Sequence, residues 1–346
     1  PAGGYSINFT TIVNNTFPIT IAGSNNTITT PNPQAIGSIT DAIFKIIGAD
    51  NIIVQDFVMQ ENALNVTTGG VTPTNATTGN NMTEWGVAMF YKSATDGAQN
   101  NSIQNNVITL NKTYANTFGI YSNTNHTAAA PTVGAAITNI SGANSGNKFY
   151  GNTVSNINMG ICIVGSQNIN FMDSGNDVGG SSSATGNTIN NWGGLAQISN
   201  YFSSSGSCYG IHLDNQKGDN VSYNTITSAV VTGTAVSIRG IFKDYNNSPT
   251  GAFTSGITHN TITVQYAYTG GTTFDGILTQ GITTANNTAT FNITDNILLN
   301  TTINAASSPT FIGIFNKSIV GVLNINNNII RGTTSASTTG SFTGIS

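Results

Sequence analysis

The chain has 346 residues, of which only 6% are charged, whereas roughly 25% is usual for a globular protein. Its formal net charge is −4, from 9 Lys+Arg and 13 Asp+Glu. This weak charge excludes a basic nucleic-acid surface and a polybasic membrane patch, and no apolar run is long enough to span a bilayer. A hydrophobic fraction of 38% provides a sizeable core, so the composition is not that of a disordered chain.

Most polar positions are Asn, Thr, Ser or Gly, which are poor residues for a helix interior. The good helix formers Glu, Lys and Arg are scarce, so the composition predicts an all-β protein. Cys162 and Cys208 are too few for a disulfide framework and lack metal-ligand spacing, so we interpret them as ordinary neutral residues. No cofactor is predicted.

A short word, Asn followed by any residue and then an aliphatic one, recurs in chain order. Its period is about 36 residues in the second half, while the first half carries insertions. Asp56-Phe57-Val58 is interpreted as filling the gap after the first copy, which predicts about nine turns. The asparagines that open the word are Asn26, Asn106, Asn152, Asn187, Asn224, Asn260, Asn296 and Asn328.

A second word, Gly followed by alternating apolar residues, runs in phase with the first, as in Gly210-Ile211, Gly240-Ile241 and Gly276-Ile277. A further short apolar segment precedes each Asn word, as in Gly256-Ile257-Thr258-His259. Each period therefore predicts three short strands separated by turn residues.

An Asn at the same place in every repeat is explained if repeats stack at about 4.8 Å, because each amide can then bond the ones above and below. An unpaired buried amide would cost about 1–3 kcal/mol, so a repeated inward Asn implies repeated partners. Asn also tolerates the left-handed backbone that a sharp corner demands. We therefore predict an Asn ladder, with Ile28, Ile226 and Ile262 pointing inward behind it.

The Asn-x-Ile and Gly-Ile words resemble those of the right-handed parallel β-helix repeat superfamily, the architecture of pectate-lyase-like proteins. The resemblance runs from about Asn25 to Ser346. It implies a right-handed, single-stranded parallel β-helix of about nine turns. We expect one domain over residues 1–346, with loop insertions in the first 210 residues. The Asn/Thr-rich, charge-poor texture is most similar to segments of large secreted bacterial surface or adhesin-type proteins, which implies an extracellular or cell-surface location.

The densest titratable group spans residues 210–217 together with Arg239, Lys243 and Asp244. Aligning the Gly words places Asp214 beside Asp244, and stacked carboxylates raise a pKa or recruit a cation. The same alignment places His212 beside Phe242 and Arg239 beside Asp275. If the protein is an enzyme, the catalytic residues are Asp214, Asp244 and Arg239; the interpretation we prefer makes them solvated edge residues neutralised by Lys217 and Lys243.

The oxygen-rich segment from Asp173 to Asp177 superficially resembles a calcium loop. It lacks the spacing and the terminal bidentate Glu of a hand-type motif, so we favour a turn and keep Asp173 and Asp177 as weak metal candidates. His126 and His259 are isolated, and we expect both to be surface residues.

Four insertions fall in the first 210 residues, at 60–85, 122–147, 165–186 and 192–209. Aromatic residues flank them, and their ring faces are candidate sugar-stacking surfaces: Trp85, Tyr91, Trp192 and Tyr201. The alternative that we favour is that they plug the loops onto the solenoid.

A hydroxyl-rich column follows the ladder aliphatic and resembles the flat face of solenoid ice-binding proteins. It consists of Thr29, Thr109, Ser155, Asn190, Thr227 and Thr263, with interruptions expected at Met59, Leu299 and Arg331. Strand propensity alone also enriches outward Thr.

The segment from Phe342 to Ser346 repeats the word from Phe311 to Phe315 in phase, and no capping helix is visible. We expect end-to-end continuation, either as part of a longer chain or as stacked copies in which residues 5–13 meet the turn ending at Ile345. The preferred function is a non-enzymatic structural or adhesive fibre whose partner is itself, with an extracellular polysaccharide as a second candidate partner. The alternative is a polysaccharide lyase or hydrolase.

Overall fold

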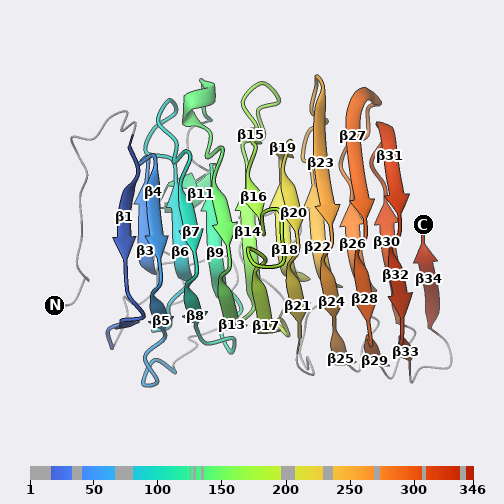
Figure 1. Cartoon of the computed structure of the whole chain (residues 1–346), viewed down its shortest axis with the longest axis horizontal. Helices are drawn as coiled ribbons and strands as arrows, with labels where there is room; N and C mark the ends of the chain where they lie inside the picture. Colours follow the sequence, from blue (N-terminus) through green and yellow to red (C-terminus); the bar gives the residue numbers. More distant parts are fainter. Residues whose placement is uncertain are drawn as a thin grey trace.

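The computed structural model describes residues 17–32, 41–66, 81–124, 126–127, 130–133, 136–195, 207–228, 237–268, 273–305, 309–335 and 340–346. The chain is a parallel β-helix, as predicted: it winds repeatedly through three parallel sheets of nine strands each. Successive turns lie side by side along the long axis, from β1 at one end to β34 at the other (Figure 1). Within the described ranges, no helix is long and apolar enough to cross a membrane.

Each turn contributes one strand to each sheet. Sheet A contains β1 (Ile19–Ala22), β4 (Ile52–Gln55), β7 (Ser102–Gln104), β12 (Lys148–Tyr150), β16 (Asp177–Val178), β20 (Asn220–Ser222), β23 (Phe253–Thr258), β27 (Asn286–Thr294) and β31 (Val320–Asn326). Sheet B contains β2 (Thr27–Thr29), β5 (Val58–Gln60), β8 (Val107–Thr109), β13 (Thr153–Ile157), β17 (Thr188–Trp192), β21 (Thr225–Thr227), β24 (Thr261–Thr263), β28 (Ile297–Leu299) and β32 (Ile329–Arg331). Sheet C contains β3 (Ala42–Ile47), β6 (Trp85–Phe90), β9 (Phe118–Asn123), β14 (Met159–Val164), β18 (Ser207–Asp214), β22 (Ser237–Asp244), β26 (Thr273–Thr279), β30 (Thr310–Asn316) and β34 (Ser341–Ile345).

Smaller elements decorate this frame. The insertion at 122–147 holds the antiparallel pair of β10 (His126–Thr127) and β11 (Ala130–Val133), then a 3-10 turn at Ile140–Gly142. Two short parallel additions are β15 (Asp173–Ser174) with β19 (Gln216–Lys217), and β25 (Gln265–Tyr268) with β29 (Thr302–Ala305) and β33 (Thr334–Ser335).

A ladder of asparagines joins the turns at the corner between sheets A and B. Each side-chain Nδ2 donates to the Oδ1 of the next ladder Asn at 2.9–3.1 Å and to a main-chain carbonyl of the preceding turn. Each Oδ1 also accepts the backbone N–H of the preceding ladder Asn. The ladder runs through Asn106, Asn152, Asn187, Asn224, Asn260, Asn296 and Asn328.

The predicted start of the ladder is wrong. Thr27 pairs with Val58, so Phe57, rather than Asp56, stands across from Asn26. Asn26 is exposed, and the ring of Phe57 cannot accept or donate as an amide does. The first ladder contact is instead made by the Phe57 backbone N–H, which donates to Asn106 Oδ1 at 3.1 Å.

The left-handed corner is also not formed by the ladder residue. The residue before it takes positive φ, as at Asn105 (55°), Tyr223 (60°), His259 (59°) and Asp295 (59°). The ladder Asn itself directly precedes the strand of sheet B and is not among the positive-φ residues. His259 is partly exposed, as expected, and its ring stacks on Tyr223 with centroids 4.6 Å apart.

The two sequence words meet inside the solenoid. Aliphatic side chains of sheet B such as Ile226 and Ile262 are buried, as predicted, and point toward the glycines of sheet C. A Cβ on Gly240 would lie 2.6 Å from the Gly276 carbonyl oxygen and 2.8 Å from Ile262 Cγ2. The Gly-Ile word therefore records a place where successive turns leave no room for a side chain.

Candidate functional site

Asp214 and Asp244 lie side by side at the ends of β18 and β22, as the alignment predicts. Both are buried, which contradicts the preferred interpretation of solvated edge residues. Burial, reinforced by the Asp244 carboxylate, raises the pKa of Asp214 well above its usual range. Asn246 Nδ2 donates to Asp214 Oδ2 at 3.0 Å, and Asp214 Oδ1 is buried without a hydrogen-bond partner.

Arg239 does not join this carboxylate pair. It lies five positions before Asp244 on the same strand, about 16 Å away at the strand rise of roughly 3.3 Å per residue. Its Nε pairs with Asp275 Oδ2 at 3.2 Å, the partner one turn away that the alignment predicts, and its guanidinium lies 4.2 Å from the Phe242 ring centroid. The three predicted catalytic residues are therefore not one constellation.

Lys243 is buried rather than at a solvated edge. Its side chain is 1% exposed, and its Nζ donates to Asp219 Oδ1 at 2.5 Å and to the Gln216 main-chain oxygen at 3.0 Å. Tyr245 Oη donates to the same Gln216 oxygen at 2.6 Å. We call these residues, with the two aspartates, the buried charge cluster: Asp214, Gln216, Asp219, Lys243, Asp244 and Tyr245.

A second amide column, which sequence reasoning missed, leads into this cluster. Asn101, Asn147 and Asn176 each accept the backbone N–H of the preceding turn and donate to one of its carbonyls. Asp177 pairs with Asn220, so Asp219 takes the next position in the column. The signal was present, because Asn147-Lys148-Phe149, Asn176-Asp177-Val178 and Asp219-Asn220-Val221 share the spacing of the ladder word.

His212 lies beside the cluster, against Phe242 as the alignment predicts. Its ring is stacked between Tyr209 at 4.6 Å and Phe242 at 4.8 Å. Burial, assisted by the Arg239 charge, lowers the pKa of His212 to about 3, so the imidazole is neutral at physiological pH.

The weak metal candidates have separate surroundings. Asp173 is buried in β15, where it accepts from the Asn144 backbone N–H at 3.2 Å and burial raises its pKa. Asp177, in β16, accepts from Tyr150 Oη at 2.5 Å and from Asn220 Nδ2 at 2.8 Å. Among the described residues, no group of three or more His, Cys, Asp or Glu is arranged to hold a metal ion.

Three of the four proposed sugar-stacking rings are not available at the surface. Trp85, Tyr91 and Trp192 are all buried, and Tyr201 lies outside the described residues. Trp85 stacks on Tyr121 with centroids 5.3 Å apart inside the solenoid. Trp85 is the first residue of β6 and Trp192 the last of β17, so both buried rings lie where an insertion meets the solenoid.

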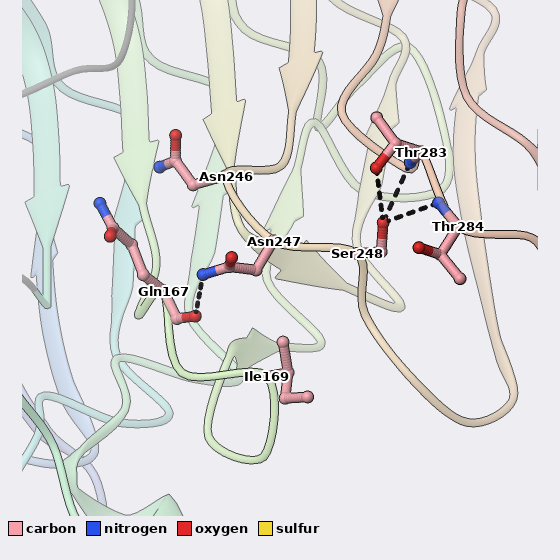
Figure 2. Close-up of a pocket in the computed structure, with 7 residues that line it drawn as sticks. All are labelled: Gln167, Ile169, Asn246, Asn247, Ser248, Thr283 and Thr284. Atoms are coloured by element: carbon pink, nitrogen blue, oxygen red, sulfur yellow. Dashed lines mark hydrogen bonds between the residues drawn. The ribbon is translucent and has the colours of Figure 1, made fainter.

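An open recess of about 520 Å³ lies next to the cluster. Figure 2 shows its lining, which is mostly amide and hydroxyl groups: Gln167, Ile169, Asn246, Asn247, Ser248, Thr283 and Thr284. Asn247 Nδ2 donates to the Gln167 carbonyl at 2.9 Å, and Ser248 Oγ accepts the backbone N–H groups of Thr283 and Thr284. Asn246 connects the two sites, since it both lines the recess and binds Asp214.

The members of the predicted hydroxyl column pair with one another between neighbouring strands of sheet B. Thr109 pairs with Ser155, Ser155 with Asn190 and Thr227 with Thr263. Gln60, rather than Met59, interrupts the column. Asp56 forms the corner of this turn, so the strand that follows is displaced by one residue from the predicted alignment and Met59 is buried. Thr109 and Ser155 hydroxyls are hydrogen-bonded to each other at 2.9 Å.

Comparison with protein-family models, curated proteins and solved structures finds no match to this chain.

Proposed function

We propose that the chain is an extracellular structural or adhesive solenoid that extends end to end. The observation that carries the proposal is the exposed apolar end of the last turn. Phe311 is 2% exposed because Phe342 stacks on it at 4.9 Å, whereas Phe342 itself, one turn on, is 60% exposed. Ile329 and Ile345 of the same turn are also exposed. A further solenoid turn would bury this surface as each turn buries the one before it.

The arrangement of charges supports a structural role. The ion pair of Lys243 with Asp219 closes one turn, and that of Arg239 with Asp275 joins two neighbouring turns. Neutral amide and apolar columns also join the turns and repeat along the solenoid. The charge-poor composition and the resemblance to repetitive surface proteins favour an extracellular or cell-surface location.

Sedimentation velocity and negative-stain electron microscopy over a range of concentrations test end-to-end assembly of copies. We expect rods whose lengths are multiples of one solenoid, and we expect Phe342→Lys to return them to single units, since a buried charge at the junction is costly. Val107→Lys is the matched control, because Val107 is 40% exposed but lies in β8, away from the last turn. Rods of one length at every concentration, or equal effects of both variants, would contradict self-assembly.

A second candidate function, a carbohydrate-active enzyme, is favoured by one observation. The Asp214–Asp244 pair borders a recess lined with amides and hydroxyls, groups that hydrogen-bond neutral sugars. A carboxyl with a raised pKa is suited to donate a proton to a glycosidic oxygen. Polysaccharides screened at several pH values, with and without calcium, test this candidate, and turnover lost in Asp214→Asn would replace the structural proposal.

A further inference from the structure

Lys243 and Asp219 form a close contact that is shielded from solvent. Both side chains are at most 1% exposed, and Lys243 Nζ lies 2.5 Å from Asp219 Oδ1. Because the carboxyl C–O bond is about 1.2 Å long, the nitrogen lies within about 3.7 Å of the Asp219 carboxyl carbon. That is close to the separation of about 3–3.5 Å at which bound reactants can attack.

The surroundings exclude water and disfavour charge. Lys243 Nζ lies 4.9 Å from the Tyr245 ring centroid and 5.6 Å from that of Phe291, and Met172 and Ile282 pack in the same apolar cluster. In such a site a buried charge pair is poorly solvated, so its replacement by a neutral amide is favoured. Burial lowers the pKa of Lys243, against the opposing attraction of Asp219.

The two oxygens of the Asp219 carboxyl group differ in their hydrogen bonds. Asp219 Oδ1 accepts from Ser255 Oγ at 2.7 Å as well as from Lys243, whereas Oδ2 is buried without a hydrogen-bond partner. Two donors on Oδ1 polarise the C–Oδ1 bond, which makes the carbon more electrophilic. Oδ2 is then the oxygen that can leave.

We propose that Lys243 and Asp219 condense to an intramolecular isopeptide bond. The nitrogen of Lys243 bonds to the Asp219 carboxyl carbon and the bond from that carbon to Oδ2 breaks. Of the three protons that the Lys243–Asp219 pair carries, one stays on the amide nitrogen and two leave with Oδ2 as water. No atom is oxidised or reduced, so the reaction needs no co-reactant.

Asp214 is a neighbouring acid of the Lys243–Asp219 pair and interacts electrostatically with Lys243. The resulting bond would close one turn of the solenoid, because Asp219 directly precedes β20 and Lys243 lies in β22 of the same turn, 24 residues later.

The intact mass of the full chain tests the bond directly and does not depend on assembly or on the proposed function. We expect a mass below that of the sequence by one water molecule, retained after complete denaturation. Trypsin should then yield a branched product, residues 218–239 joined to 240–317, because a linked Lys243 is not cleaved. The unmodified mass, with separate peptides ending at Arg239 and Lys243, would overturn the proposal without affecting the structural one.

Variants locate the bond. Lys243→Met and Asp219→Ala should each show the full mass of their own sequence, whereas Lys217→Met should keep the deficit, since Lys217 Nζ donates to the exposed Thr250 carbonyl instead. A deficit that persists in Lys243→Met would reject the assignment of the amine, and one that persists in Asp219→Ala would reject the assignment of the carboxyl group.

Discussion

The ladder corner and the buried charge cluster solve the same problem in two ways. Both are polar columns buried along the solenoid, and both begin with asparagines that bond to the turn before. An amide donates and accepts, so the ladder can repeat from Asn106 to Asn328 without a change of residue. A carboxylate only accepts, so the second column ends at Asp219, where Lys243 and Ser255 supply the donors. A single Asn→Asp replacement therefore converts a repeating contact into a unique site.

The largest loss of stability is expected when one partner of the Lys243–Asp219 contact is removed. Lys243→Met should lower the free energy of unfolding by about 3–5 kcal/mol, because it leaves the Asp219 carboxyl group buried without its Lys243 partner. The denaturation midpoint in guanidinium measures this loss. Asp219→Asn combined with Lys243→Met extends the amide column and removes both charges, so the double variant should unfold at higher denaturant concentration than Lys243→Met. A double variant that is no more stable would show that the two columns are not interchangeable.

Low pH should lower the free energy of unfolding through the region of the buried charge cluster. The ladder should be unaffected, because its asparagines do not titrate. His212 has a folded-state pKa of about 3 against an unfolded value of 6.5, so between these limits the unfolded state binds the extra proton. Its contribution to stability is present above pH 6.5 and falls by about 1.4 kcal/mol per pH unit as the pH drops toward 3.

His212→Phe, which mimics the stacked Phe242, should remove this part of the pH dependence. Denaturant midpoints at pH 7 and pH 4 for both proteins give the difference. The raised pKa of Asp214 acts with the opposite sign in both proteins and cancels. An identical slope in the variant would mean that the imidazole titrates normally.

The ladder predicts a dependence on position. Asn224→Leu strands the amide of Asn187 on one side and that of Asn260 on the other, whereas Asn328→Leu strands only that of Asn296. The mid-ladder variant should lose about 1–3 kcal/mol more, the cost of one further unsatisfied buried polar group. Thermal or urea unfolding measures the difference, and equal midpoints would argue against additive contacts along the ladder.

The smallest expected change in stability concerns the spacing between turns, on which both columns depend. Gly240→Ala places a methyl group 2.6 Å from the Gly276 oxygen and should cost about 1–3 kcal/mol by overpacking. Gly344 occupies the same column in the last turn, and no atom lies within 4 Å of a Cβ built there. Gly344→Ala should therefore leave the unfolding midpoint unchanged; a loss as large as that of Gly240→Ala would point to backbone preference instead of space.

The sequence by itself determined the contacts that recur. Parallel stacking of turns, the inward aliphatics, the Gly-Ile approach and most of the ladder each involve the same residue type in every period, so alignment of the words was enough to place them. The pairings of Asp214 with Asp244, His212 with Phe242 and Arg239 with Asp275 followed from the same alignment.

Only the tertiary structure decided what occurs once. Lys243 faces the interior because a corner of the solenoid brings it to Asp219. Neither residue recurs at its position in other turns, so alignment of the repeats could not predict this contact. The register at Asp56 and Phe57 was missed because different residues can form the same corner. A register shift of one residue is enough to move Met59 from the outward column into the core. The burial of Trp85 and Trp192 likewise follows from packing between turns, which residue type alone does not specify.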